Sequence, residues 1–271
     1  MKKGYWLSII QLVILICALS GGRLLANSDG ASELSSAQTT QKLQKLHMPF
    51  IANEGQTDES VKFYANTFGG SVFVTKDGEI VYALPKVVKE SEMQSSRTDK
   101  ELALKKQFQH NEVVALKEEV VNGKFTEITG EGKSVTQVNY FTGNDQSKWK
   151  TNISTYETAN LGEVYAGIDL KLKAYGNNVE KLFTVKPDAD PETIRLKLSG
   201  AKALKINKDG QLEVRMELGA VKFTKPVAFQ EIDGKRVEVP VRYRIQKQEI
   251  GDKSQETRVG GRIGEHNRKV Q

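Results

Sequence analysis

The chain has 271 residues, of which 38% are hydrophobic, and a single cysteine, Cys17. Its net charge of +6 falls to +3 when the N-terminal Lys2, Lys3 and Arg23 are set aside, and the remaining basic residues are interspersed with acidic ones. This excess is too small to indicate a nucleic-acid-binding protein. A chain that loses Cys17 with an export signal can form neither a disulfide nor a thiolate metal site.

Residues 1–26 have the pattern of a cleavable export signal. A basic start precedes a charge-free, mainly apolar run from Leu7 to Leu19, and small residues follow. The run is shorter than the roughly 20 apolar residues of a membrane-spanning helix, which argues against the alternative of an uncleaved anchor. A small residue would precede the cut after Ser20, Gly22 or Ala26, and we favour Ala26. We therefore expect a secreted or periplasmic protein without a stable membrane span.

The mature chain begins with a polar stretch, residues 27–47, that we expect to be a flexible leader. One β-rich domain is expected from residue 48 to 250. Its first strands are predicted at 61–65, 71–75 and 79–84, since these short runs of β-branched and aromatic residues are separated by Gly69-Gly70 and by a turn ending in Asp77-Gly78. This pattern predicts a three-stranded meander.

Residues 86–111 are polar and form either a long loop or an insertion, with a helix expected over Lys100–Phe108. The domain could divide into two sub-domains here. Strand patterns resume at 112–121 and 125–128, and the Asn122-Gly123 between them predicts a hairpin.

The C-terminal half alternates apolar and polar residues over 168–174, 194–198, 212–216 and 237–245. Alternation with a period of two indicates sheets with one buried face and one solvated face. We therefore predict an all-β fold, an antiparallel β-sandwich-like domain with short turns. Residues 251–271 are polar and Gly-rich, and we expect a disordered tail there.

Three phrases go beyond this general pattern. Residues 138–156 read VNYFTGNDQSKWKTNISTY and are followed by VYAGIDL at 164–170, residues 187–201 read PDADPETIRLKLSGA, and residues 225–236 read KPVAFQEIDGKR. In order and spacing they resemble the N-terminal domain of unknown function that precedes SBBP beta-propeller repeats in secreted bacterial proteins. The resemblance implies an exported protein and assigns no catalytic residue.

The sequence departs from that family in two places. Lys181-Leu182 stands where the family phrase has Tyr-Asp, and the chain ends at Gln271 without the propeller repeats. The expectation that follows is either a stand-alone version of the domain or a truncated product.

Four residues are candidates for ligand binding: Trp149, Tyr156, Asp145 and Asp169. Aromatic faces can stack on sugars or on partner side chains, although core packing is the favoured explanation. Two carboxylates such as Asp145 and Asp169 could hydrolyse a glycoside only if they converged across a cleft. The acidic turn at 188–192 could bind calcium, but a plain turn is the simpler interpretation. No catalytic residue, cofactor or metal site is predicted.

The leading hypothesis is an exported, non-catalytic β-rich module for adhesion, assembly or partner binding, whose partners are other surface or repeat domains. The alternative is a carbohydrate-binding or carbohydrate-processing domain. A glycan-active hydrolase is the enzymatic version of that alternative.

Overall fold

The computed structural model describes residues 10–17, 45–85, 113–217, 219–246 and 255–260. The insertion expected at 86–111, most of the leader expected at 27–47 and most of the tail expected at 251–271 lie outside these residues. The described residues form nineteen strands and two short 3-10 helices, with no α-helix among them.

The strands follow one another in short segments. The first eight are β1 (Ile10–Cys17), β2 (His47–Met48), β3 (Phe50–Ala52), β4 (Val61–Thr67), β5 (Gly70–Thr75), β6 (Ile80–Pro85), β7 (Val113–Val120) and β8 (Thr129–Tyr140). After η1 (Gln146–Lys148) come β9 (Lys150–Tyr165), β10 (Ile168–Tyr175) and β11 (Asn178–Val185). After η2 (Pro191–Thr193) come β12 (Arg195–Ser199), β13 (Ala203–Ile206), β14 (Leu212–Met216), β15 (Gly219–Phe223), β16 (Val227–Ile232), β17 (Lys235–Val239), β18 (Arg242–Gln246) and β19 (Gln255–Gly260).

The strand ladders of the described residues are antiparallel and connect into one folded sheet. The meander β4–β5–β6 continues through β7 and β12 to β19 and β18. In the other direction β4 leads through β3 and β9 to β10, β11 and β1. From β1 the sheet branches to β15 with β14 and β13, and to β16 with β17.

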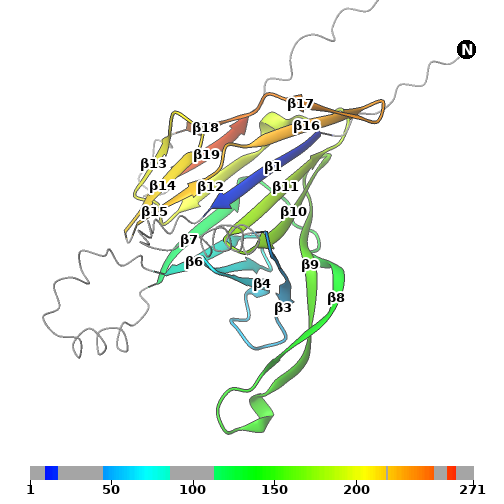
Figure 1. Ribbon diagram of the computed structural model, residues 1–271, viewed down its shortest axis with the longest axis vertical. Helices are drawn as coiled ribbons and strands as arrows, with labels where there is room; N and C mark the ends of the chain where they lie inside the picture. The colour runs from blue at the N-terminus through cyan, green and yellow to red at the C-terminus, as the bar shows by residue number, and fades with distance from the viewer. Residues whose placement is uncertain (1–9, 18–44, 86–112, 218, 247–254, 261–271) are drawn as a thin grey trace, which may run out of the picture.

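Figure 1 shows how this sheet folds back on itself. Strands β3, β4, β6 and β7 lie beneath the layer that contains β10, β11 and β1, and the β8–β9 hairpin extends away from both. The prediction of an all-β, sandwich-like fold is confirmed. The predicted meander is confirmed as well, because β4, β5 and β6 pair in sequence.

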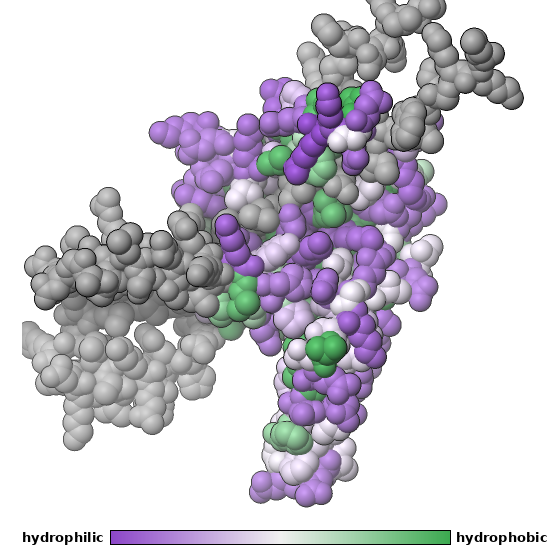
Figure 2. Space-filling view, turned by 45° about the vertical axis from the view of Figure 1, so that its right-hand side comes forward, coloured by the Kyte–Doolittle hydropathy of each residue, from purple (hydrophilic) through white to green (hydrophobic). Residues whose placement is uncertain are grey.

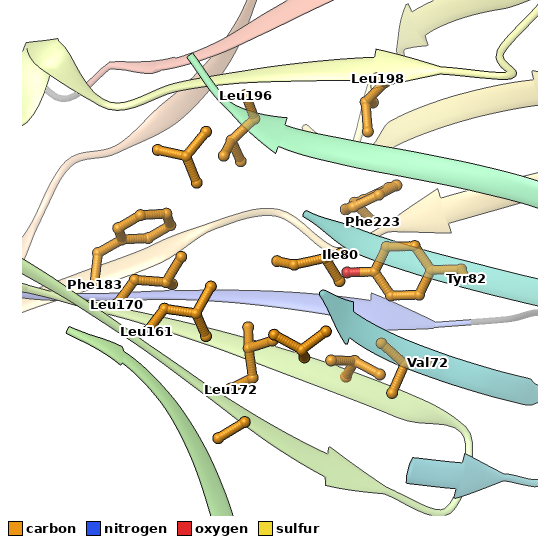
Figure 3. Packing of buried hydrophobic residues seen from close by; sticks show 14 of the residues in the cluster. Val72, Ile80, Tyr82, Leu161, Leu170, Leu172, Phe183, Leu196, Leu198 and Phe223 are labelled. Atoms are coloured by element: carbon orange, nitrogen blue, oxygen red, sulfur yellow. The ribbon is translucent and has the colours of Figure 1, made fainter. Parts of the chain in front are cut away.

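The core lies where the two layers face each other. Strands β10 and β11 alternate strictly between buried and half-buried side chains, and the alternation predicted at 168–174 is that of β10. Figure 3 shows Leu170, Leu172 and Phe183 from these strands converging with Val72 and Ile80 of the meander. Full burial of an aliphatic or aromatic side chain of this size contributes about 1.5–3 kcal/mol, so this alternation is the main source of stability.

The hairpin predicted around Asn122-Gly123 does not form. Asn122 adopts a turn conformation with a φ of 58°, but the residues after it form no strand until β8 begins at Thr129. The second edge of β7 is occupied by β12, where Leu196 lies opposite Val120. The intervening segment instead packs on the body, with Ile128 buried and Phe125 against Gly78.

The alternating stretch at 237–245 is divided in the structure. Strand β17 ends at Val239 and β18 begins at Arg242, on either side of Pro240, which has no backbone N–H for a ladder. Val237 is 44% exposed, whereas Tyr243 is buried. The buried face predicted for this stretch therefore exists only in its second half.

Both ends of the described chain join the sheet. The prediction of disorder at 251–271 is wrong for Gln255–Gly260, because these residues form β19 between β12 and β18. Ile10–Cys17, the middle of the expected export signal, forms β1. This strand has β11 on one side and both β15 and β16 on the other. Cleavage of residues 1–26 stays a prediction.

Candidate functional site

The β8–β9 hairpin forms an arm that leaves the body of the molecule. Its strands have 12 and 16 residues, longer than any other described strand. Figure 2 shows the arm as a narrow projection with isolated apolar patches on a mainly polar surface. We call residues 141–149, which connect its two strands, the arm tip.

The arm tip is held by local contacts. The rings of Phe141 and Trp149 meet edge to face with their centres 5.1 Å apart, and the Trp149 indole N–H donates to the carbonyl oxygen of Gly143 at 3.2 Å. Phe141 is 62% exposed, while Trp149 is half-buried. Such a pair is worth about 0.5–1.5 kcal/mol, so it orders the tip and still offers apolar surface to a partner.

Asp145 caps η1 at the arm tip. Its Oδ1 accepts hydrogen bonds from the backbone N–H of Ser147 at 3.1 Å and from the Ser147 hydroxyl at 2.7 Å. These bonds stabilise the carboxylate and lower the pKa of Asp145. Asp145 therefore has a structural role as a helix cap.

A second small core joins the arm to the body. It consists of Ile51, Val61, Tyr64 and Ile153, with Val138 and Tyr140 of the arm packed against it. The hydroxyl of Tyr64 also donates to that of Tyr140 at 2.7 Å. The arm is thus anchored on β3 and β4. The ladder between β9 and β3 ends at Thr155, and from Ser154 to Lys150 the described ladders join β9 to β8 alone.

Tyr156 lies at this anchored base. Its ring meets Phe63 edge to face at 5.6 Å and covers Gly130, where an added Cβ would lie 2.3 Å from the ring. A glycine in a strand leaves room for a cross-strand aromatic ring, and Tyr156 occupies that room. Its surroundings give Tyr156 a packing role.

Asp169 lies on β10, opposite Glu163 of β9. Its Oδ2 is 3.3 Å from the ammonium nitrogen of Lys186, which also contacts the Glu163 carboxylate. The side chains of Lys186 and Glu163 are about half exposed, so this group is a surface ion-pair network.

The four candidate residues do not form one site. Trp149 precedes Lys150, the start of β9, and Glu163 lies 13 residues further along the same strand. At about 3.3 Å per residue that separation is roughly 40 Å of strand. Asp145 and Trp149 share the arm tip, but Asp169 lies in the body, and the two carboxylates do not converge as a glycosidase would require.

The most unusual group of the body is one that the sequence analysis did not identify. The ammonium of Lys181 on β11 lies 2.7 Å from both carboxylate oxygens of Glu118 on β7, and both side chains are 0% exposed. The Tyr82 hydroxyl donates to Glu118 at 3.1 Å, and the Lys181 nitrogen lies 4.5 Å from the centre of the Phe223 ring. We call Glu118, Lys181 and Tyr82 the buried charge cluster.

Burial controls the titration of this cluster. It lowers the pKa of Lys181, although Glu118 opposes that shift, and it raises the pKa of Tyr82 well above its usual value. Tyr243 lies in the same electrostatic environment and its pKa is raised for the same reason. Since both charged side chains are closed to solvent, the pair connects the two layers and offers no surface to a substrate.

Two signals in the sequence mark this cluster. Lys181 interrupts the apolar alternation of Val179, Phe183 and Val185, and Glu118 stands between Leu116 and Val120 in the same way. A charge at a buried position requires a partner of opposite charge. Glu118 is the counterion of Lys181.

The acidic turn at 188–192 is a cap. Asp190 accepts a hydrogen bond from the backbone N–H of Glu192 at 2.9 Å and begins η2, which also contains Pro191. Across the described ranges, no three His, Cys, Asp or Glu residues are grouped so that they could hold a metal ion. A search of the same residues for a helix of sufficient length and apolarity to span a membrane found none.

The comparisons with known proteins identify a family without a known activity. No match was found among curated proteins or among solved structures. The family model described as "Domain of unknown function (DUF7948)" matches residues 50–260, from the start of β3 to the end of β19. The match covers more than half of the chain and contains the meander, the arm and the buried charge cluster. The chain therefore belongs to the DUF7948 family of domains of unknown function.

Proposed function

We propose that this protein is an exported, non-catalytic module that binds a partner through the tip of its β8–β9 arm. Export is supported by the signal pattern of residues 1–26 and by the resemblance to domains of secreted repeat proteins. Binding at the tip is supported above all by Phe141, which is 62% exposed at the end of a projection that is anchored on the body. In this proposal the partner is another surface or repeat domain.

The arrangement of the tip fits recognition better than chemistry. Aromatic residues are enriched at protein interfaces, where they bury large area at little cost in conformational entropy. The tip carboxylate of Asp145 is occupied by Ser147, and the candidate carboxylate of the body, Asp169, is paired with Lys186. Neither carboxylate lies in a setting that would prepare it for acid–base catalysis.

The test compares attachment of purified protein to cells of the producing species from which the gene has been deleted. Phe141→Ala should abolish most of the attachment. The matched control is Phe68→Ala, because Phe68 is 56% exposed but lies on the turn between β4 and β5. Equal attachment by the two variants would contradict a role for the tip.

Export is tested separately by the mass of the protein outside the cytoplasm, which should correspond to a chain shortened by about 26 residues.

Carbohydrate binding is the second candidate, and the exposed aromatic surface of the tip also favours it. Sugars stack on aromatic faces, so Trp149→Ala should then abolish binding to a glycan array without changing the unfolding transition. Binding that survives digestion of surface glycans and is lost after protease treatment of the cells would instead support a protein partner.

A further inference from the structure

Strand β1 fills a gap in the sheet. It pairs with β11 over all eight of its residues, from Ile10 opposite Val185 to Cys17 opposite Asn178. On its other side it pairs with β16 over four residues and with the end of β15 over two. Figure 1 shows β1 lying lengthwise between β11 and β16. We call this position the strand slot.

The geometry of the slot prevents its flanking strands from replacing β1 directly. Both β11 and β16 are antiparallel to β1, so they are parallel to each other. They stand two strand spacings apart, roughly 10 Å, and closing the gap would move one of them by about 5 Å. Strand β15 cannot follow such a movement freely, because Val221 and Phe223 are part of the core.

Removal of the export signal would therefore leave two open strand edges inside the molecule. The backbone groups of Asn178–Val185 that face β1 would lose their ladder, and so would those of Val227–Gln230. Unpaired edges of this kind are templates for the addition of another strand.

We propose that the strand slot is a binding site for an extended segment of another exported polypeptide, which pairs antiparallel to β11 after the signal has left. The proposal rests on the export and signal removal proposed above. It adds a second binding site, distinct from the arm tip, with its own chemistry. In the full chain the segment Ile10–Cys17 occupies the slot and keeps it closed to other strands.

The register defines the segment that fits. Four positions of β1 lie opposite buried residues of β11, and four lie opposite half-buried ones. A ligand strand needs about eight residues with apolar side chains at the alternate positions opposite Val179, Lys181, Phe183 and Val185. It tolerates polar side chains at the positions between them, opposite residues such as Glu180 and Thr184.

The experiment uses the full chain with Leu12→Pro and Val13→Pro. Neighbouring residues of a strand direct their N–H groups to opposite sides, so the two prolines remove one donor toward each flanking strand and release β1. The probe is a fluorescent peptide with the sequence of residues 9–18, flanked by lysines for solubility and carrying Cys17→Ser. It should bind the double-proline chain and should bind wild type at least about tenfold more weakly, because the slot is occupied there.

Two controls define the specificity. A peptide with the same two prolines should not bind, and Ser28→Pro in the chain should behave as wild type because Ser28 lies outside β1. If the double-proline chain is unfolded by itself, the peptide must restore its folding. Failure of the peptide either to bind or to restore folding would overturn the proposal, and so would equal binding to wild type.

Other outcomes distinguish this proposal from self-association of the chain and from binding at the arm tip. Dimers of the double-proline chain that the peptide dissociates would assign the slot to a second copy of the chain and overturn the proposed heterologous partner. Phe141→Ala in the double-proline background should leave peptide binding unchanged. The slot and the arm tip can therefore fail independently, and a signal that is retained outside the cytoplasm would contradict the signal removal on which the slot depends.

Discussion

The body and the arm of this molecule use apolar residues in different ways. In β10 and β11 alternate side chains are buried at 0–5% exposure and form the core. At the arm tip Phe141 is 62% exposed, and its ring partner Trp149 is only half-buried. Folding accounts for the apolar residues of the body, but it does not require an exposed aromatic ring at the end of a projection. The comparison favours the arm tip over the body as the surface that binds a partner.

The body buries an ion pair, Glu118 and Lys181, and this pair gives the largest expected effect. Glu118→Ala would leave the Lys181 ammonium buried without its carboxylate partner, which is fully enclosed in wild type. Removing one member of a buried ion pair costs about 3–5 kcal/mol. We expect a loss of this size in the free energy of unfolding, measured by urea denaturation.

A double variant shows whether the buried charge cluster is needed for stability. Glu118→Leu with Lys181→Met replaces both charges by apolar groups of similar volume, and such replacements are often neutral or stabilising. The double variant should therefore recover most of the stability that Glu118→Ala loses. A double variant as unstable as Glu118→Ala would show that hydrogen bonding within the cluster, including that from Tyr82, matters more than charge burial.

The joint between arm and body gives the next largest effect. Gly130→Ala would place a Cβ 2.3 Å from the Tyr156 ring and force the ring away from Phe63. Overpacking of this kind costs about 1–3 kcal/mol. The loss should be seen in thermal or urea unfolding, and in a Tyr156→Leu background it should shrink toward zero, as a double-mutant cycle would show. If Gly130→Ala still caused its full loss of stability in the Tyr156→Leu background, the cause would lie in the backbone at position 130 and not in a clash with the ring.

The buried charge cluster makes the stability of the body depend on pH. Burial raises the pKa of Tyr82, so the folded protein keeps a proton that the unfolded chain loses near pH 10. The folded state then binds more protons, and the free energy of unfolding falls as pH rises, by about 1.4 kcal/mol per pH unit. The lowered pKa of Lys181 opposes this trend below pH 10.5.

Comparison with Tyr82→Phe isolates the tyrosine. Above pH 10.5 the wild type should lose stability faster than this variant in urea denaturation at successive pH values. Parallel curves for the two proteins would mean that Tyr82 ionises in the folded state as it does in the unfolded chain.

The sequence predicts strands of the body where apolar and polar residues alternate. The alternation at 168–174 predicts the buried face of β10, because burial is what a period of two reports. The partner of a charge is not encoded locally: Lys181 and Glu118 are 63 positions apart, and only the folded sheet shows that they meet. The missing hairpin after β7 is a similar case, because β12 takes the edge that the turn at Asn122 would have offered.

Site residues were harder still to predict. Trp149 and Asp145 lie close together, since they are four positions apart around one turn. Tyr156 and Asp169 shared their phrase but not their environment, because a continuous strand carries residues apart by about 3.3 Å at each step. Position in one phrase therefore did not decide which of the four residues meet, and strand geometry did.

The smallest expected effect belongs to the arm tip and tests the comparison most directly. Trp149 contacts Phe141 and Gly143 within the tip, so Trp149→Ala should change the free energy of unfolding of the body by about 0.5 kcal/mol or less. Urea denaturation followed by circular dichroism measures the body. Because the chain has two tryptophans, Trp6→Phe leaves Trp149 as the one fluorescent reporter of the tip. Its emission should shift at a lower urea concentration than the circular dichroism, since a tip held by local contacts opens at lower free energy than the core. Coincident transitions would mean that the arm unfolds with the body as one unit. The exposed aromatic surface of the tip would then depend on the folding of the whole domain.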